Sequence, residues 1–202
     1  MPGRASTSSW TSARASPTAG NVHEIAQRAN PEAKVVYVDN EPVAVAHSEL
    51  LLENNPNAVA FEADLRDPDS ILGHDKTRKM LDFDRPIGLL SVAVYHFIPE
   101  ADDPLALAAR YRAALPGGSF LALSHVTEDS MGDQVRQLVD LMRASQNPVT
   151  PRTKAQFTAM FDGFDLVEPG VVFTPQWHPE SPEDVGERPQ DSAVYAAVGR
   201  KP

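Results

Sequence analysis

The chain has 202 residues, 42% of them hydrophobic, and a formal net charge of -10 at pH 7. This length and apolar fraction are typical of one globular domain with a single sizeable core. The acidic excess argues against a nucleic-acid partner, because neutralising phosphates needs clustered Lys and Arg. The sequence contains no Cys, which excludes disulfides and thiolate metal sites and fits a protein of the reducing cytoplasm.

Residues 1–19 are mainly Ser, Thr, Ala, Arg and Pro, with almost no large apolar side chains. Such a segment buries too little surface to offset the entropy of ordering, so it is predicted to be a disordered tail. The folded domain is predicted to cover residues 20–202. No apolar stretch approaches the roughly twenty residues that span a bilayer, and the N-terminus lacks the apolar core of a signal peptide. We therefore expect a protein that is neither exported nor embedded in a membrane.

Helical and strand patterns alternate from residue 20 onward, which predicts an α/β fold with a mostly parallel sheet. The predicted helices cover Asn21–Ala29, Val43–Glu53, Pro68–Leu81, Pro104–Leu115, Gly132–Ser145 and Thr153–Met160. The predicted strands cover Val35–Val38, Ala58–Glu62, Pro86–Val94, Ser119–Ser124, Phe164–Val167, Val171–Phe173 and Ala193–Val198. The Pro- and Glu-rich segment 175–189 is predicted to be a long surface connection between two strands.

Polar residues follow three successive predicted strands. They are Asp39 with Asn40, then Asp64, then Ser91. Ligands of open α/β sheets lie beyond the carboxyl ends of the strands, where an acid after the second strand can accept hydrogen bonds from ribose hydroxyls. Asp64 could accept from an adenine amine. Either acid could instead cap the helix that follows it, and this alternative stays open.

Several segments carry a resemblance to a known family. They are Val35-Val-Tyr-Val-Asp-Asn-Glu-Pro, Ala63-Asp-Leu-Arg-Asp-Pro, Leu81-Asp-Phe-Asp-Arg-Pro, Val92-Ala-Val-Tyr-His-Phe-Ile-Pro and Leu115-Pro-Gly-Gly-Ser. Together they resemble the actinobacterial S-adenosylmethionine-dependent methyltransferases once catalogued as a domain of unknown function, over about residues 17–200. The resemblance implies a Rossmann-like class I methyltransferase fold, whose last strand runs antiparallel, and S-adenosylmethionine as cofactor.

The same resemblance implies roles for individual residues. Asp39, with Asn40 beside it, would bind the ribose, and Asp64 and Leu65 would bind the adenine. Ser91, Val92 and Ala93 would line the methionine side of the cofactor. The expected function is methyl transfer to a small molecule, whose identity the sequence does not reveal.

The family's first strand and glycine loop should precede Pro17, in a pattern such as Phe-Leu-Asp-Leu-Gly-Thr-Gly-Leu-Pro. This chain has Ser8-Ser-Trp-Thr-Ser-Ala-Arg-Ala-Ser there, so we expect the first strand to be missing or irregular and cofactor binding to be impaired. Residues 1–16 are interpreted as the product of a shifted reading frame, because the single Trp codon followed by Thr11 spells Asp in the shifted frame. The following codons can then spell the rest of the family pattern.

His96 follows the fourth predicted strand and His125 the fifth, and either could contact the substrate, since His titrates nearest to neutral pH. No catalytic residue is assigned, and no His or acidic spacing suggests a metal site. A noncatalytic scaffold of the same fold is the main alternative, with Trp177 as a candidate partner contact. A nicotinamide-dependent oxidoreductase is a lesser one, because it shares the acid after the second strand. The oligomeric state is left open.

Overall fold

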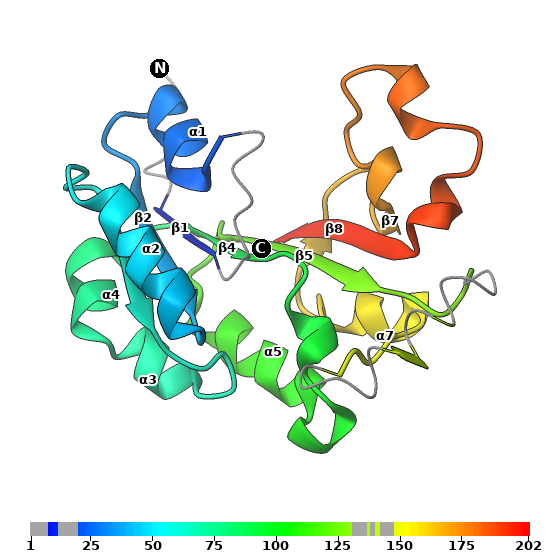
Figure 1. Ribbon diagram of the computed structural model, residues 1–202, viewed down its shortest axis with the longest axis horizontal. Helices are drawn as coiled ribbons and strands as arrows, with labels where there is room; N and C mark the ends of the chain where they lie inside the picture. Colours follow the sequence, from blue (N-terminus) through cyan, green and yellow to red (C-terminus); the bar gives the residue numbers. More distant parts are fainter. Residues whose placement is uncertain (1–7, 12–19, 131–136, 138–139, 142–147) are drawn as a thin grey trace. The chain divides into compact units, whose positions relative to one another are not determined.

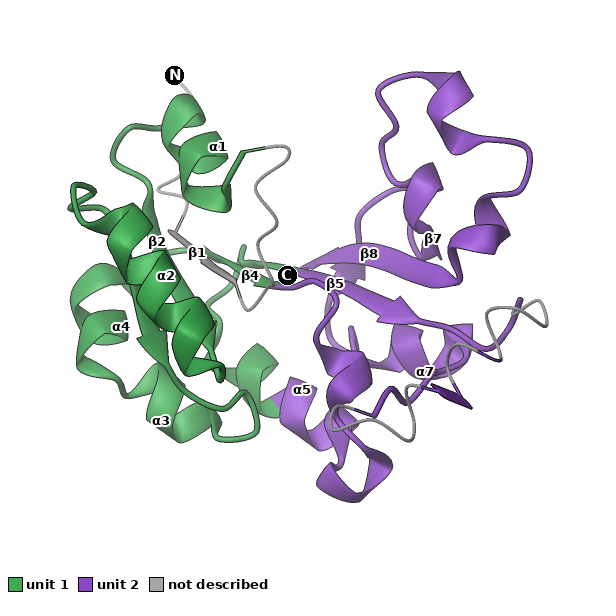
Figure 2. Ribbon diagram, viewed as in Figure 1, with its two compact units in different colours: residues 1–90, 110–121, 201 green, residues 91–109, 122–200, 202 purple. Residues whose placement is uncertain are grey.

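The computed structural model describes residues 8–11, 20–130, 137, 140–141 and 148–202 (Figure 1). The chain divides into two compact units, which alternate along the sequence (Figure 2). Unit 1 comprises residues 1–90, 110–121 and 201, and unit 2 comprises residues 91–109, 122–200 and 202. Each unit is described below by itself.

Unit 1 is built on parallel strands. They are β1 (Ser8–Thr11), β2 (Lys34–Asp39), β3 (Ala58–Glu62) and β4 (Ile87–Ser91), of which only Ser91 belongs to unit 2. Strand β1 pairs with β2 and β4, and β2 pairs with β3, all in parallel. The order of hydrogen-bonded strands is therefore β3-β2-β1-β4, followed by β5 (Phe120–Val126), which begins in unit 1 and continues in unit 2.

The first strand is present, so the expectation that it would be missing or irregular was wrong. Ser9 pairs with Val35 of β2 and with Gly88 of β4. A gap at this place would leave the facing backbone groups of both neighbours unpaired, and backbone pairing does not depend on apolar side chains. Trp and Thr also favour strands. Residues 1–7 and 12–19, on which the rest of the predicted tail falls, lie outside the described residues.

Helices cover both faces of this sheet. Helices α1 (Val22–Ala29) and α2 (Pro42–Leu52) pack on the face that carries the buried side chains of Val35, Ala58 and Ala60. The strand register places Ile87 and Leu89 on the opposite face. There they line a small apolar cavity together with side chains from α3 (Pro68–Leu72), α4 (Asp75–Met80) and α5 (Pro104–Ala114).

The sequence predicted one helix over Pro68–Leu81, but the structure has two, α3 and α4. Gly73 ends α3 with its N–H bonded to the Asp69 carbonyl at 2.9 Å. A Cβ atom at Gly73 would lie 2.8 Å from that carbonyl oxygen, so the turn suits glycine. His74 then starts α4, because its Nδ1 accepts a hydrogen bond from the Lys76 N–H at 3.1 Å. This side-chain cap was not visible in the helical periodicity.

In unit 2 the strands are ordered β5-β8-β6, and β7 also pairs with β8. Strand β8 (Val194–Arg200) runs antiparallel to β6 (Asp165–Leu166) and to β7 (Val172–Phe173). The predicted antiparallel last strand is therefore confirmed. Helix α7 (Lys154–Ala159) begins at a capping box formed by Thr153 and Gln156. The predicted helix Gly132–Ser145 falls largely outside the described residues.

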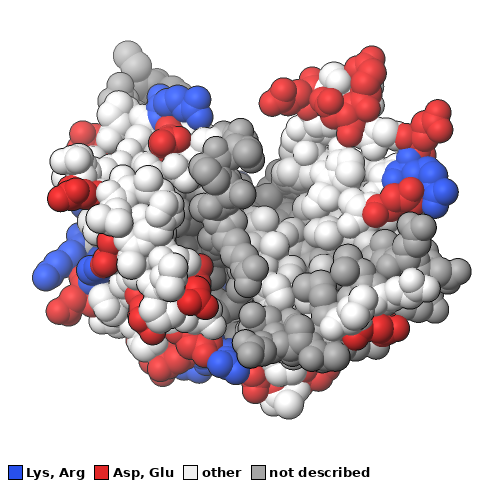
Figure 3. Space-filling model, viewed as in Figure 1, with Lys and Arg blue, Asp and Glu red and all other residues white. Residues whose placement is uncertain are grey.

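The connection between β7 and β8 carries short 3-10 turns at Thr174–Gln176, Pro182–Val185 and Pro189–Ser192. Its exposed side chains are largely acidic and include Glu180, Glu183, Asp184 and Glu187 (Figure 3). Because β7 and β8 are antiparallel, this segment is the long hairpin connection that its composition predicted. No helix in the described ranges is long and apolar enough to cross a membrane.

The end of the chain returns to unit 1. The Lys201 N–H donates to the Ser119 carbonyl at 2.8 Å, and the Gly118 N–H donates to the Lys201 carbonyl at 2.9 Å. Lys201 Nζ donates to the carbonyls of Arg112 and Leu115 at 2.9 and 2.6 Å. An ammonium group at these carbonyls caps the C-terminal end of α5, and its positive charge interacts favourably with the negative end of the helix dipole.

Candidate functional site

Two acidic residues lie at the carboxyl ends of neighbouring strands in unit 1. Asp39 ends β2, and its carbonyl accepts a hydrogen bond of 3.0 Å from the Ala63 N–H, just after β3. Asp39 is in register with Glu62, so Asp64 follows at the same edge of the sheet. The structure thus places both acids at the edge where open α/β sheets bind ligands.

The carboxylate of Asp39 is half-buried and bonds only its own loop. Its Oδ1 accepts the Glu41 N–H at 2.9 Å, in a turn that leads into α2. Glu41, not Asp39, is the N-cap residue of α2. Asp39 Oδ2 has no hydrogen bond to the described part of the chain and is free to accept one from a ligand. Asn40 beside it is exposed.

The carboxylate of Asp64 is paired with Arg66, which the sequence did not predict. Its Oδ1 accepts the Arg66 N–H at 2.8 Å, and its Oδ2 accepts from Arg66 Nε at 2.9 Å. These hydrogen bonds hold the pKa of Asp64 below its usual range. The two side chains are 37% and 53% exposed, so the ion pair is weak enough for a ligand to replace it. The cap of α3 is Asp67, and the helix-cap alternative for Asp64 is therefore excluded.

Leu65 presents a backbone donor at the same edge. Its side chain is buried, and its carbonyl accepts a hydrogen bond of 2.7 Å from the Tyr111 hydroxyl. This long-range bond fixes the peptide unit after Asp64. The Leu65 N–H has no partner among the described residues.

In unit 2, Ser91 ends β4, and Val92 and Ala93 form the turn that follows it. Ser91 is buried, whereas Val92 and Ala93 are exposed. Ala93 has a left-handed backbone with φ of 58°, which an L-residue adopts only at a cost in free energy. Its N–H donates to Ser124 Oγ at 2.9 Å, which holds this turn. The strand therefore ends at Ser91 and does not reach Val94 as predicted.

His96 is buried in the same unit, and its Nδ1 makes no hydrogen bond with any residue that the structure describes. Loss of hydration and, to a smaller extent, the positive charge of Arg152 together lower the pKa of His96 to about 4. The ring is therefore neutral at pH 7. It meets the ring of His125 edge to face, with 5.8 Å between centroids.

His125 is the penultimate residue of β5, near the strand end as the sequence predicted, and is fully buried. Its Nδ1 lies 2.7 Å from the Val126 carbonyl and its Nε2 lies 2.8 Å from Arg152 Nη1. Because the carbonyl can only accept, Nδ1 carries the proton and Nε2 accepts from the guanidinium. Burial lowers the pKa of His125 to about 3. Both nitrogens are engaged inside the core, so we assign His125 no contact with a substrate.

Arg152 is the polar residue that the sequence did not single out. Its side chain is 2% exposed and bonds His125, two backbone carbonyls and Glu100. Arg152 follows Pro151 in a segment without helical or strand periodicity, and its partners lie 27 to 57 residues away in sequence. No local pattern identifies such a residue. Among the described residues, no group of His, Asp and Glu could hold a metal ion.

Comparisons with known proteins identify the family of this chain. The sequence profile of the family described as S-adenosyl methyltransferase matches residues 14–202. A solved structure of a DUF574 family protein from Streptomyces avermitilis has 38% identity and a TM-score of 0.90, over 96% of this chain and 75% of that protein. A candidate methyltransferase from Thermobifida fusca has 35% identity and a TM-score of 0.87, over 98% of this chain and 73% of that protein. No curated protein matches the sequence.

More distant structures share the fold alone. Human N-acetylserotonin methyltransferase, solved in complex with SAM, has 15% identity and a TM-score of 0.55, over 97% of this chain and 47% of that protein. The strand order β3-β2-β1-β4-β5-β8-β6, with β8 antiparallel to β6, belongs to this same class I methyltransferase fold.

Proposed function

The chain belongs to the S-adenosyl methyltransferase family and is an S-adenosylmethionine-dependent methyltransferase, and from this premise we propose which residues bind the cofactor and what kind of molecule receives the methyl group. The observation that carries the proposal is the pair of acids at neighbouring strand ends in unit 1. Asp39 and Asp64 follow β2 and β3 at one edge of the sheet.

The free groups at this edge fit adenosine. Asp39 Oδ2 accepts from the ribose hydroxyls, with Asn40 beside it. The Leu65 N–H donates to an adenine ring nitrogen, and Asp64 accepts from the exocyclic amine after its carboxylate leaves Arg66. Ser91, Val92 and Ala93 of unit 2 contact the methionine part of the cofactor. The cofactor supplies the activated methyl group, and these residues hold it in place.

The methyl acceptor is proposed to be a small neutral molecule. His96 is uncharged at pH 7, and the Arg152 guanidinium is already paired with Glu100. These groups offer no unpaired positive charge to an anionic acceptor, whereas the His96 Nδ1 can pair with a hydroxyl or amine. The absence of Cys fits action in the cytoplasm.

Cofactor binding is proposed to be weak in this chain. Residues 12–19 read Ser-Ala-Arg-Ala-Ser-Pro-Thr-Ala and contain no glycine, whereas a glycine loop lets backbone N–H groups approach the ligand. The shifted reading frame of residues 1–16 remains our explanation for this departure. Sequencing the source DNA across the codons for Ser8 to Thr18 tests it, and a verified frame without a nearby base change would contradict it.

Calorimetry with S-adenosylhomocysteine tests the adenosine site. Replacing residues 8–15 with Phe-Leu-Asp-Leu-Gly-Thr-Gly-Leu should raise the affinity at least about tenfold, because backbone donors then reach the ligand. Micromolar affinity of the unaltered chain would contradict the proposed impairment.

A matched pair of variants then separates ligand binding from turn formation. Asp39→Asn should lower the affinity of the restored protein about tenfold, since a charged acceptor is lost. Asp82→Asn is the control, because Asp82 Oδ1 accepts the Asp84 N–H at 3.0 Å in a turn of the same kind. Equal affinities for both variants would refute the role of Asp39.

The noncatalytic scaffold is the second candidate function, and Trp177 is the residue that favours it. Its indole is half-buried in the β7–β8 connection and meets His178 at 4.9 Å between ring centroids. If the restored protein binds S-adenosylhomocysteine but transfers no methyl group to any of a set of small hydroxyl and amine compounds, the scaffold replaces the enzyme as the better interpretation.

A further inference from the structure

Arg152 makes three hydrogen bonds and one ion pair with its two terminal nitrogens, all within unit 2. Nη1 donates to the Tyr95 carbonyl at 3.1 Å and to His125 Nε2 at 2.8 Å. Nη2 donates to the Ile98 carbonyl at 2.8 Å and pairs with Glu100 Oε1 at 2.7 Å. Three of these acceptors belong to the segment 95–100, and the fourth belongs to β5. The guanidinium therefore ties this segment to the strand.

Backbone bonds on both sides of Arg152 reinforce the connection. The Thr150 N–H donates to the His96 carbonyl at 2.7 Å, and the Arg152 N–H donates to the Val126 carbonyl at 3.1 Å. Val149 and Arg152 are both buried. The segment 149–152 thus contacts the His96 peptide on one side and the end of β5 on the other.

The acceptors require an arginine in particular. Two of them are backbone carbonyls, one is an imidazole nitrogen and one is a carboxylate, and they surround a planar group. A guanidinium presents its donors in a fixed fork, whereas a lysine presents three donors at one point. A buried cation with fewer partners would be strongly destabilising, so the four contacts explain how this charge is tolerated in the core.

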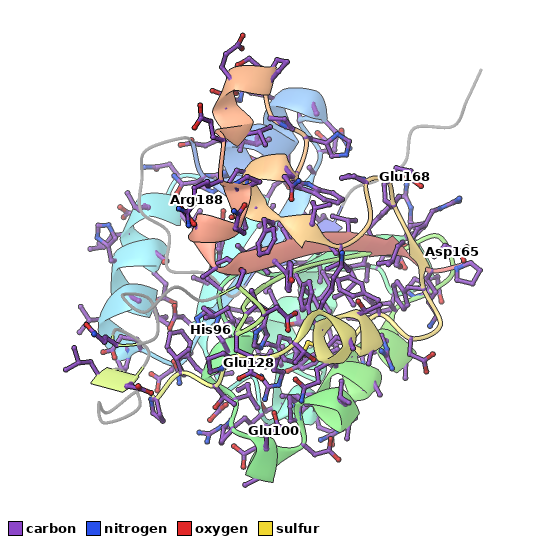
Figure 4. The ribbon with its side chains drawn as sticks, turned by 90° about the vertical axis from the view of Figure 1, so that its right-hand side faces the viewer. His96, Glu100, Glu128, Asp165, Glu168 and Arg188 are labelled. Carbon is purple, nitrogen blue, oxygen red and sulfur yellow. The ribbon has the colours of Figure 1, made fainter. Side chains whose placement is uncertain are left out.

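The segment that Arg152 holds is the one that carries His96. Figure 4 shows His96 and Glu100, which lie four residues apart on either side of Ile98. His96 has a neutral ring with one unpartnered nitrogen, and such an atom is useful to a ligand only if its place is fixed. The residues that bind the 95–100 segment therefore decide where that nitrogen lies.

We propose that Arg152 is a positioning residue for the acceptor side of the enzyme: its guanidinium fixes the 95–100 segment and the single neutral tautomer of His125, and through them the place of His96. The inference rests on the proposed function only in assigning His96 to the acceptor. We call the contacts of Arg152 with the 95–100 segment and with His125 the clamp. The clamp is a property of the protein without ligand, and its test uses no cofactor.

Amide hydrogen exchange of the full chain tests the clamp. Arg152→Met keeps the length of the side chain and removes every donor. It should speed exchange at the amides of Phe97, Ile98 and Thr150 at least about tenfold. Amides of β2 and β3 in unit 1 should change much less. Arg188→Met is the matched control, because Arg188 is an exposed residue of unit 2 that pairs with Asp191, and it should leave these amides unchanged.

The NMR chemical shifts of the imidazole nitrogens give a second readout. A residue that only stabilised the fold would leave these shifts unchanged. In the unaltered protein His125 should show a protonated Nδ1 and a hydrogen-bonded, unprotonated Nε2. Arg152→Met should remove the hydrogen-bond shift of Nε2, and Arg152→Lys should restore it in part. An Nε2 resonance that is the same in all three proteins would overturn the proposal.

Glu100→Ala keeps the test decisive if Arg152→Met does not fold. The Glu100 side chain is 64% exposed, so this variant should fold, and it removes one of the four acceptors. It should speed exchange at Ile98 and Thr150 about threefold while sparing β2 and β3. Exchange that is unchanged, or that rises equally in both units, would overturn the proposal. If Glu100→Ala shows this selective increase in exchange but the restored protein binds no S-adenosylhomocysteine, the role of Arg152 stands. Only the proposed function is then contradicted.

Discussion

The polar residues of the candidate site are held in opposite ways in the two units. In unit 1, Asp39 and Asp64 are partly exposed and bond partners two residues away in sequence. In unit 2, His125 and Arg152 are buried and bond each other across 27 residues. The first arrangement can exchange its partners for a ligand at little cost. The second cannot, so changes in unit 2 should alter stability and changes in unit 1 should alter binding.

The largest expected effect is a loss of stability in acid caused by the histidines of unit 2. The folded pKa values of His96 and His125 are about 4 and about 3, below the usual 6.5. As the pH falls below 6.5, the unfolded chain takes up two protons that the folded chain does not, so the free energy of unfolding falls. The loss should reach about 5 kcal/mol at pH 4.5.

Urea unfolding at several pH values between 7 and 4.5 measures this loss. His96→Gln should remove about half of the slope, because one of the two buried imidazoles is then absent. A free energy of unfolding that stays constant over this range would show that the histidines are not buried as the structure describes.

A smaller effect is expected from the unpartnered hydroxyl in the core of unit 1. Thr77 is buried, and within the described part of the chain its Oγ1 makes no hydrogen bond. Thr77→Val should therefore raise the free energy of unfolding by about 1 kcal/mol, because an unsatisfied polar atom is removed. Thermal or urea unfolding measures the change.

Thr127→Val is the matched control in unit 2. Thr127 is equally buried, but its Oγ1 accepts the Asp129 N–H at 3.1 Å. The same substitution should destabilise the protein by about 1 kcal/mol. If both variants shift stability in the same direction, the contrast between an unpartnered and a partnered hydroxyl fails.

The smallest effect on stability is expected at Asp64. Its ion pair with Arg66 is exposed to solvent, so Asp64→Asn should change the free energy of unfolding by no more than about 0.5 kcal/mol. The lowered pKa of Asp64 means that this contribution is present above pH 4 and lost in stronger acid. The same variant should reduce S-adenosylhomocysteine affinity about tenfold in the restored protein. If Asp64→Asn causes a large loss of stability, Asp64 behaves like the buried residues of unit 2, which would contradict the predicted contrast.

The contrast between the units also explains what the sequence could predict. Strand β3 and helix α2 match their predicted ranges almost to the residue, because a short apolar run between turn residues and apolar periodicity are local signals. Asp39 and Asp64 were found for the same reason, since Asp39 ends β2 and Asp64 comes two residues after β3. The break at Gly73–His74 was missed because a side-chain cap interrupts a continuing helical pattern.

Long-range partners account for the remaining errors. Nothing near Arg152 in sequence indicates that its donors meet His125 and the 95–100 segment, and the fully buried place of His125 depends on the same contacts. Strand β1 was missed because its residues are poor in apolar side chains, although its neighbours β2 and β4 supply backbone partners on both sides.

The hydrogen bonds of Lys201 have a consequence for the order of folding during synthesis. Lys201 belongs to unit 1 and completes the hydrogen bonds at the end of α5, although residues 122–200 before it belong to unit 2. Unit 1 therefore cannot be completed during translation until all of residues 122–200 have been made.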